Sequence, residues 1–375
     1  MKKGIFSSIG ALIILAGANI AYTTGAGYGT GQELMQYFTS YGNIGFLGLF
    51  ILVILFMVFD SIIAADSRKY KLKNLNDVFK HYCGNILGKI LSIFSFVFLF
   101  GMASLMIAGA GAYFSEYFSI NTLIGSALMS GCVLLTCLLG LKKTVNIIGS
   151  IGPAIVIFVF VIGITAILNA QMDLKSGSEF LVTKGSTLQP SNNWLIASLM
   201  FFSFCTLFRG PYIIGSAIHR NEPIKIVVWG NIIGMALYGI LGFILMAGQI
   251  MNASLVDGKE VPNLTLGSMI SPVIGGIFGL VLILAIFTTA TPLIWSVSDI
   301  VTKEDSKFYP WVVIIACCLA FLTSNLATFS VLYNFISTIA AYVGIFFIVP
   351  VFYTKFFREP KVPVDDSIDS MTKNM

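Results

Sequence analysis

The sequence YTTGAGYGTGQE, residues 22–33, decides how we interpret the rest of the chain. Glycine occupies every second position from 25 to 31, and each glycine costs a helix about 1 kcal/mol relative to alanine. Residues 5–21 are almost all apolar, as in a membrane-spanning helix. We therefore predict a first helix that is interrupted inside the membrane. Lipid tolerates a broken backbone only where it is buried in protein or lines a cavity, so the freed main-chain groups are candidates for binding an ion or a polar substrate.

The composition places the chain in a membrane. Of its 375 residues, 57% are hydrophobic and 10% are charged, which is outside the range of soluble globular domains. The net charge of +5 lies in loops and tails, so we expect membrane lipid around the protein and no nucleic acid as a partner. The start Met1-Lys2-Lys3 is similar to that of a signal peptide. Cleavage would remove half of the interrupted helix, so we expect this segment to be retained.

Apolar segments of membrane-spanning length predict an all-α membrane protein with about ten transmembrane helices. We place them at residues 5–38, 44–65, 88–118, 121–139, 144–168, 193–217, 224–251, 266–301, 309–324 and 329–356. Basic residues follow every even-numbered segment, including Arg68, Lys142, Arg220, Lys303 and Lys355. This pattern predicts a multi-pass protein of the cell (plasma) membrane with both termini in the cytoplasm. We expect one transmembrane domain at 1–358 and a disordered cytoplasmic tail at 359–375.

The segments divide into two sets of five, at about 5–168 and 193–356. An odd number of helices in each set makes the two sets enter the membrane from opposite sides, which is an inverted repeat. The first segment of the second set contains Phe204-Cys205-Thr206-Leu207-Phe208-Arg209-Gly210-Pro211, which predicts a second interruption. Interrupted helices at corresponding positions indicate the binding site of a transporter. The alternative is that the glycines only allow close helix packing, but alternating glycines do not lie on one helical face.

This arrangement resembles the leucine-transporter (LeuT) fold of the amino acid, polyamine and organocation (APC) superfamily. The strings GAGYGTGQE at 25–33 and AGAGAYFSEYF at 108–118 are similar to those of the YkvI-like bacterial membrane proteins. The resemblance covers nearly the whole chain. It implies a 5+5 inverted repeat with discontinuous helices 1 and 6, and it names no substrate.

The resemblance also implies a sodium site between the first and eighth segments. The corresponding residues are Ala21, Thr24, Ala285, Thr288 and Thr289. Backbone carbonyls and hydroxyls suit a hard cation, and residues 285, 288 and 289 share one helical face. Some proton-driven relatives carry a lysine in the fifth segment, whereas residues 144–168 contain none, which favours an ion. The alternative is that the threonines only hydrogen-bond to carbonyls of their own helix.

Arg209 is the most informative single residue, because an arginine inside the membrane is usually paired or functional. Its guanidinium could bind a substrate carboxylate, pair internally with Glu33 or Asp60 as a gating or structural charge pair, or extend to the cytoplasmic side. We predict substrate-binding residues around both interruptions: Thr24, Gly25, Ala26, Gly27, Tyr28, Gly29, Phe202, Phe204, Thr206, Phe208 and Arg209. Main-chain amides near Tyr28 together with Arg209 favour an amino acid or another small carboxylate.

These features together predict a secondary active transporter that moves a small molecule by sodium-coupled symport. The alternatives are a proton-coupled carrier or exchanger of the same fold, and a transport-inactive sensor or channel. The sequence has no GxSxG motif, no clustered histidines and no close pair of carboxylates, so we expect no enzyme activity. We expect no cofactor apart from sodium as the coupling ion, and a monomer or homodimer.

Overall fold

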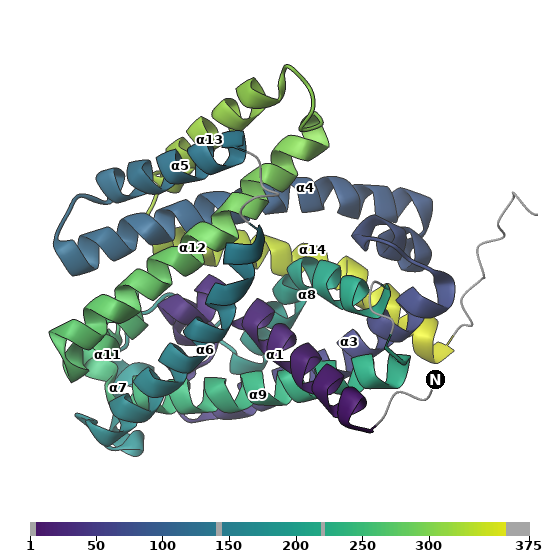
Figure 1. Ribbon diagram of the computed structural model, residues 1–375. Coiled ribbons are helices and arrows are strands. Elements are labelled where there is room, and N and C mark those ends of the chain that lie inside the picture. The colour runs from purple at the N-terminus through teal and green to yellow at the C-terminus, as the bar shows by residue number, and fades with distance from the viewer. Residues whose placement is uncertain (1–4, 140–144, 219–221, 358–375) are drawn as a thin grey trace, which may run out of the picture.

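The structure, a computed structural model, describes residues 5–139, 145–218 and 222–357 (Figure 1). These residues form fourteen α-helices and one short 3-10 helix, and they contain no strand. The helices are α1 (Ile5–Thr30), α2 (Gln32–Tyr37), α3 (Ile44–Tyr70), α4 (Leu75–Phe118), α5 (Thr122–Leu139), α6 (Val145–Leu168), α7 (Leu174–Lys184), α8 (Trp194–Ile218), α9 (Ile224–Met251), α10 (Ala253–Val256), α11 (Pro262–Ile270), α12 (Pro272–Val301), α13 (Tyr309–Ser324) and α14 (Phe329–Phe357), with η1 (Thr39–Tyr41) after α2.

Each of the ten predicted segments is helical, so the all-α membrane architecture is confirmed. Eight helices of the described part are long and apolar enough to cross a membrane: α1, α3, α4, α5, α8, α9, α12 and α14. Two shorter apolar helices, Pro153–Leu168 within α6 and Tyr309–Ser324, complete the ten. The short helices α7, α10 and α11 lie between the long ones in the chain. The orientation of the termini stays a prediction, and the tail lies outside the described residues.

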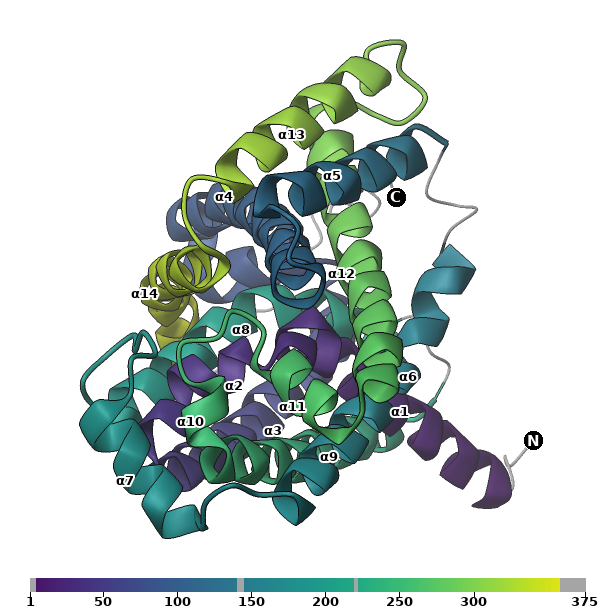
Figure 2. The same ribbon diagram turned by 90° about the vertical axis from the view of Figure 1, so that its left-hand side faces the viewer.

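The contacts between helices repeat in the way that two related five-helix sets require. The contact of α1 with α9 has its counterpart in that of α8 with α3, and the contact of α4 with α5 in that of α12 with α13. Likewise α14 packs on α4 and α6 packs on α12. Helix α3 also contacts α9, and α4 contacts α12. In each of these pairs the two helices hold the same position in their respective five-helix sets. Figures 1 and 2 show α5 and α13 together at one side of this arrangement.

The predicted interruption of the first helix is confirmed. Gly25 has φ 38° and ψ −158°, which is a non-helical conformation inside α1. Gly31 has φ 82° and separates α1 from α2. Both angles lie in the region that glycine adopts without steric cost, so the glycine run makes the breaks possible.

The predicted interruption of the sixth segment is wrong. Helix α8 runs as one helix from Trp194 to Ile218 with Pro211 inside it. Proline removes one main-chain donor, but a membrane helix tolerates this when neighbouring groups supply hydrogen bonds. The carbonyl that Pro211 leaves without its helical donor is that of Leu207. The next carbonyl along, that of Phe208, accepts an additional hydrogen bond from the hydroxyl of Tyr22 at 2.8 Å. Only the first of the two predicted discontinuous helices is therefore discontinuous.

Two predicted boundaries also differ from the structure. The third segment begins at Leu75 and not at 88, and its first part ends at a non-helical Gly84 with φ 74°. The segment predicted from 266 is divided into α11 and α12, because Ser271 is extended and caps α12 by accepting from the amide of Val273. Pro272 at the first position of α12 favours this new start.

Candidate functional site

The main-chain carbonyls freed by the interruption of α1 already have partners. The side-chain amide of Asn263 in α11 donates to the carbonyls of Tyr28 at 2.7 Å and Gly29 at 3.2 Å. The amide of Gln249 in α9 donates to the carbonyl of Gly31 at 3.1 Å. These carbonyls are therefore already capped, whereas the residues of α1 predicted to hold the ion are Ala21 and Thr24. Buried carbonyls need such partners, and side chains of two neighbouring helices supply them.

Arg209 forms an internal ion pair with Asp60 of α3, and both side chains are buried with 2% exposure. Its guanidinium also donates to the hydroxyl of Thr23 and, at 3.4 Å, to the side-chain oxygen of Asn19, both in α1. The guanidinium carbon lies 4.7 Å from the centre of the Phe56 ring. Of the three alternatives for Arg209, the structure thus contains the pair with Asp60. The guanidinium joins α8 to α1 and α3 directly beside the interruption.

Glu33 does not take part in that pair. Its side chain turns back against Gly27, where an added Cβ atom would lie 1.7 Å from the Oε1 atom of Glu33. The carboxyl group therefore occupies space that only glycine leaves open. Glu33 is buried, and the ion pairs in the described part of the chain do not include it. An unpaired buried carboxyl group beside a broken helix is the strongest chemical feature of this region.

The aromatic residues predicted to line the site fall into two groups. Phe204 is buried among the rings of Phe208 and Tyr333, at 5.5 Å and 6.1 Å between ring centres, on the side of Glu33. Phe202 instead packs against Phe56 of α3, and the two ring centres are 5.3 Å apart. The hydroxyl of Thr206 donates to the carbonyl of Ser203 in its own helix, so it is used inside α8.

Among the residues predicted to bind sodium, one threonine hydroxyl has no hydrogen-bond partner and two donate within their own helix. Thr288 and Thr289 both donate to the carbonyl of Ala285, at 3.0 Å and 2.9 Å, which is the alternative arrangement considered above. The hydroxyl of Thr24 is buried with no hydrogen-bond partner. Helices α1 and α12 are in contact, and Gly29 lies against Leu282.

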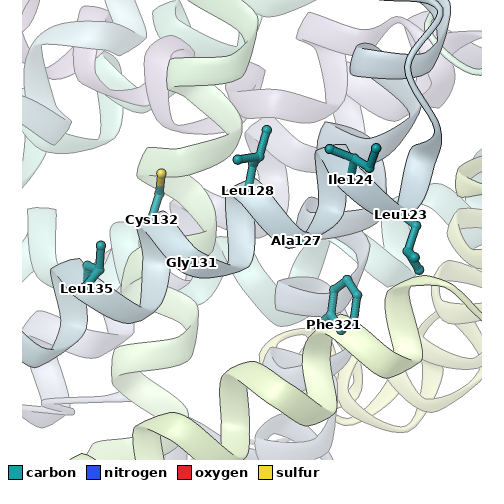
Figure 3. Close-up of a pocket in the computed structure, with 8 residues that line it drawn as sticks. All are labelled: Leu123, Ile124, Ala127, Leu128, Gly131, Cys132, Leu135 and Phe321. Carbon is teal, nitrogen blue, oxygen red and sulfur yellow. The ribbon is translucent and has the colours of Figure 1, made fainter.

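A groove of about 490 Å³ lies away from this region, along α5 and against α13. Figure 3 shows its walls, which include Ile124, Leu128, Leu135 and Phe321. Its lining is apolar and its helices lie at one side of the molecule (Figure 2). This surface suits the acyl chains of lipid, whereas the polar groups capable of binding a solute gather at the interruption of α1.

Comparison with solved structures identifies the fold. The chain is similar to the manganese transporter of Eremococcus coleocola in complex with an aromatic bis-isothiourea substituted compound, with a TM-score of 0.59 and 15% identity over 99% of this chain and 86% of that one. A variant of the same transporter gives a TM-score of 0.61 at 14% identity, with the same coverage. The chain has the fold of a membrane transporter. At this identity the likeness concerns the fold alone.

Two curated proteins of Bacillus subtilis (strain 168) are similar in sequence. Uncharacterized membrane protein YkvI is 26% identical over 148 residues, which are 40% of this chain and 43% of that protein. Uncharacterized protein YyaD is 32% identical over 93 residues, which are 25% of this chain and 27% of that protein. The chain thus spans less than half the length of the relatives it matches. No protein-family model matches the chain.

Sequence reasoning missed the amides that complete the site. Asn263 and Gln249 cap the interruption, and the side-chain amide of Asn19 donates to the oxygen of Asn231 at 3.0 Å next to Arg209. A signal was present for part of this set, because Asn231 and Gln249 are polar residues within an otherwise apolar α9. Their partners lie far away in sequence, so the pairing itself could not be predicted.

Proposed function

We propose that this protein is a secondary active transporter that moves a small organic solute by alternating access, with the solute bound where α1 is interrupted. The observation that carries the proposal is a discontinuous first helix, with buried hydroxyl and carboxyl groups beside it, in a chain with the fold of a membrane transporter. The structural neighbours described above are manganese transporters. Here the side chains around the break are aromatic rings, hydroxyls and one carboxyl group, which favour an organic solute over a hard divalent cation that takes six or more oxygen ligands.

The proposed solute is an amino acid or another small carboxylate, carried by symport with sodium. Arg209 is weaker support for a carboxylate on the solute than the sequence suggested, because its guanidinium already pairs with Asp60. Sodium coupling is supported by the unpartnered hydroxyl of Thr24 and by the contact of α1 with α12, the helix that carries Thr288 and Thr289. Rotation of these hydroxyls away from the carbonyl of Ala285 would free three oxygen atoms for one ion.

The test is uptake by the purified protein in liposomes, with sodium replaced by potassium at fixed pH. We expect uptake of the transported amino acid to require sodium, and Thr289→Ala to raise the sodium concentration needed for half-maximal uptake. Thr136→Ala is the matched control, because Thr136 also bonds to a carbonyl of its own helix but lies half-buried on α5 and is not among the residues predicted to hold sodium. Uptake that is indifferent to sodium would refute the ion site and favour a proton-coupled carrier or exchanger.

Counterflow separates a carrier from the other proteins of this fold class. A carrier exchanges labelled solute outside the liposome for unlabelled solute inside, whereas a channel does not. Saturable binding without any flux would identify a sensor. Labelled solute accumulating against its gradient would support the proposed transporter.

A further inference from the structure

The surroundings of Glu33 suggest what kind of solute the site accepts. Glu33 is 7% exposed, and its carboxyl group lies at the point where α1 gives way to α2. Burial of a carboxylate is costly unless a cation or several hydrogen bonds compensate it. No lysine, arginine or histidine of the described residues forms an ion pair with Glu33. The nearest cation in the core, Arg209, is already paired with Asp60.

Hydroxyl groups surround Glu33 without satisfying it. The hydroxyl of Tyr333 lies beside the carboxyl group, but it makes no hydrogen bond of good geometry. The hydroxyl of Tyr28 is also buried and has no partner. Tyr238, whose ring centre is 4.3 Å from that of Tyr28, is the next hydroxyl in the group. Two unpartnered hydroxyls and a carboxyl group in one buried region are an incomplete set that lacks donors with positive charge.

Aromatic rings close the remaining sides. The rings of Tyr37 and Tyr333 are 6.3 Å apart, and Phe204 lies 6.1 Å from Tyr333. The hydroxyl of Tyr37 donates to Ser337 at 2.7 Å, so only the ring of Tyr37 is available for contact with a solute here. Faces and edges of several aromatic rings around one carboxylate are the environment in which proteins bind ammonium groups.

We infer that Glu33, with the hydroxyl of Tyr333, binds the positively charged amino group of the transported solute. The inference rests on the proposed function and specifies it: the solute is an amine or an amino acid, and a carboxylic acid without an amino group is not accepted. An ammonium group has three donors, and the carboxylate of Glu33 and the hydroxyl of Tyr333 offer acceptors for them. The charge of the ammonium would then compensate the charge of the carboxylate that the protein leaves unpaired.

The test uses matched sets of three compounds that differ only in their charged groups. One set is leucine, 3-methylbutylamine and 4-methylpentanoate, and a second is phenylalanine, 2-phenylethylamine and 3-phenylpropionate. Binding to the purified full-length protein in detergent is measured at fixed sodium and pH. We expect the amino acid and the amine of at least one set to bind, and the acid lacking the amino group to bind at least tenfold more weakly.

Variants then locate the amino group. We expect Glu33→Gln to weaken binding of the amine tenfold or more, which corresponds to about 1.4 kcal/mol or more. Tyr333→Phe should weaken it a few-fold, because the ring stays and the hydroxyl is lost. Glu179→Gln is the control, since Glu179 is an exposed carboxylate on α7 and its loss should leave binding unchanged. Thermal unfolding of each variant without solute shows that it is folded.

Three results would overturn the inference: equal binding of acid and amine, unchanged amine binding by folded Glu33→Gln, or no binding of any amine or amino acid in the sets. A loss of the pH dependence of uptake in Glu33→Gln with unchanged amine binding would assign Glu33 to proton transfer instead. The groups facing it in that case are Tyr28, Tyr37, Tyr238, Tyr333 and Cys205. Counterflow of the bound amine in liposomes tests the carrier separately: binding without counterflow refutes the transporter and leaves the amine site standing.

Discussion

Replacing Arg209 by methionine tests the ion pair at the centre of the helix bundle. The side chain of Arg209 pairs with Asp60, donates to Thr23 and lies over the ring of Phe56, all in a buried environment. Methionine has a similar length and is apolar, so Arg209→Met removes the charge without opening a large cavity. The main consequence is a buried Asp60 carboxylate that has lost its cation.

The expected magnitude follows from that loss. Removing one partner of a buried ion pair costs about 3–5 kcal/mol, because the other charge stays buried and uncompensated. The lost cation–π contact with Phe56 contributes about 1–2 kcal/mol within this range. Replacing both partners, with Arg209→Met and Asp60→Leu together, should restore most of the stability, because an apolar pair of similar volume is often neutral. The two single variants and the double variant form a cycle that isolates the pair.

The assay is the free energy of unfolding of the purified protein in detergent, measured without solute. Lys303→Met is the control, because Lys303 is 79% exposed and its pair with Asp299 lies at the surface, where such pairs contribute under about 1 kcal/mol. If folded Arg209→Met were as stable as the wild-type protein and had lost only solute binding, the reasoning would be wrong. Arg209 would then contact solute and the pair would be incidental.

Three further predictions follow from the interruption and from the outer loops. Gly27→Ala should reduce solute binding strongly, because the new methyl group would occupy the place of the Glu33 carboxyl group. Gly17→Ala is the control in the same binding assay, because a methyl group added at Gly17 would meet no atom within 4 Å. Asn263→Ala should lower the free energy of unfolding by about 1–3 kcal/mol, because two buried carbonyls lose their donor, and a wild-type value would contradict this. Burial raises the pKa of Asp257, but hydrogen bonds from hydroxyls and amides after α7 outweigh it, so the net pKa is lowered. Ionised Asp257 therefore stabilises the fold at pH values above its pKa in the unfolded chain, and this stabilisation is lost as the pH falls through its pKa in the folded protein. Asp257→Asn should therefore reduce the loss of unfolding free energy between about pH 7 and pH 3, measured by unfolding at each pH.

The fold was largely predictable from local signals. Long apolar segments and the alternating glycines gave the helices and the break at Gly25, because both depend on residues close together in the chain. The break expected near Pro211 is absent because α8 accommodates the proline within one continuous helix, which no local pattern reveals. Local propensity thus predicts where a membrane helix can break, and tertiary contacts decide whether it does.

The site was predictable only in part, for a related reason. Arg209 and Asp60 were candidates by their charge inside apolar segments, yet the choice between solute contact and internal pairing required knowledge of contacts 149 residues apart. The cap by Asn263 spans 235 residues. Glu33 was one of two alternative partners considered for Arg209, and the structure turns its carboxyl group against Gly27. Side-chain chemistry marks the participants, and only the fold assigns their partners.

The amides of Asn263 and Gln249 have a consequence for the return step of a transport cycle. They hold the main chain of the α1 interruption without help from any cargo, from α11 and α9 respectively. The part of α1 after Gly25 and the short helix α11 should therefore move as one unit. Because no carbonyl at these positions is stranded when the protein is unloaded, we expect the empty protein to reorient at a useful rate. That behaviour favours net accumulation over obligatory one-for-one exchange.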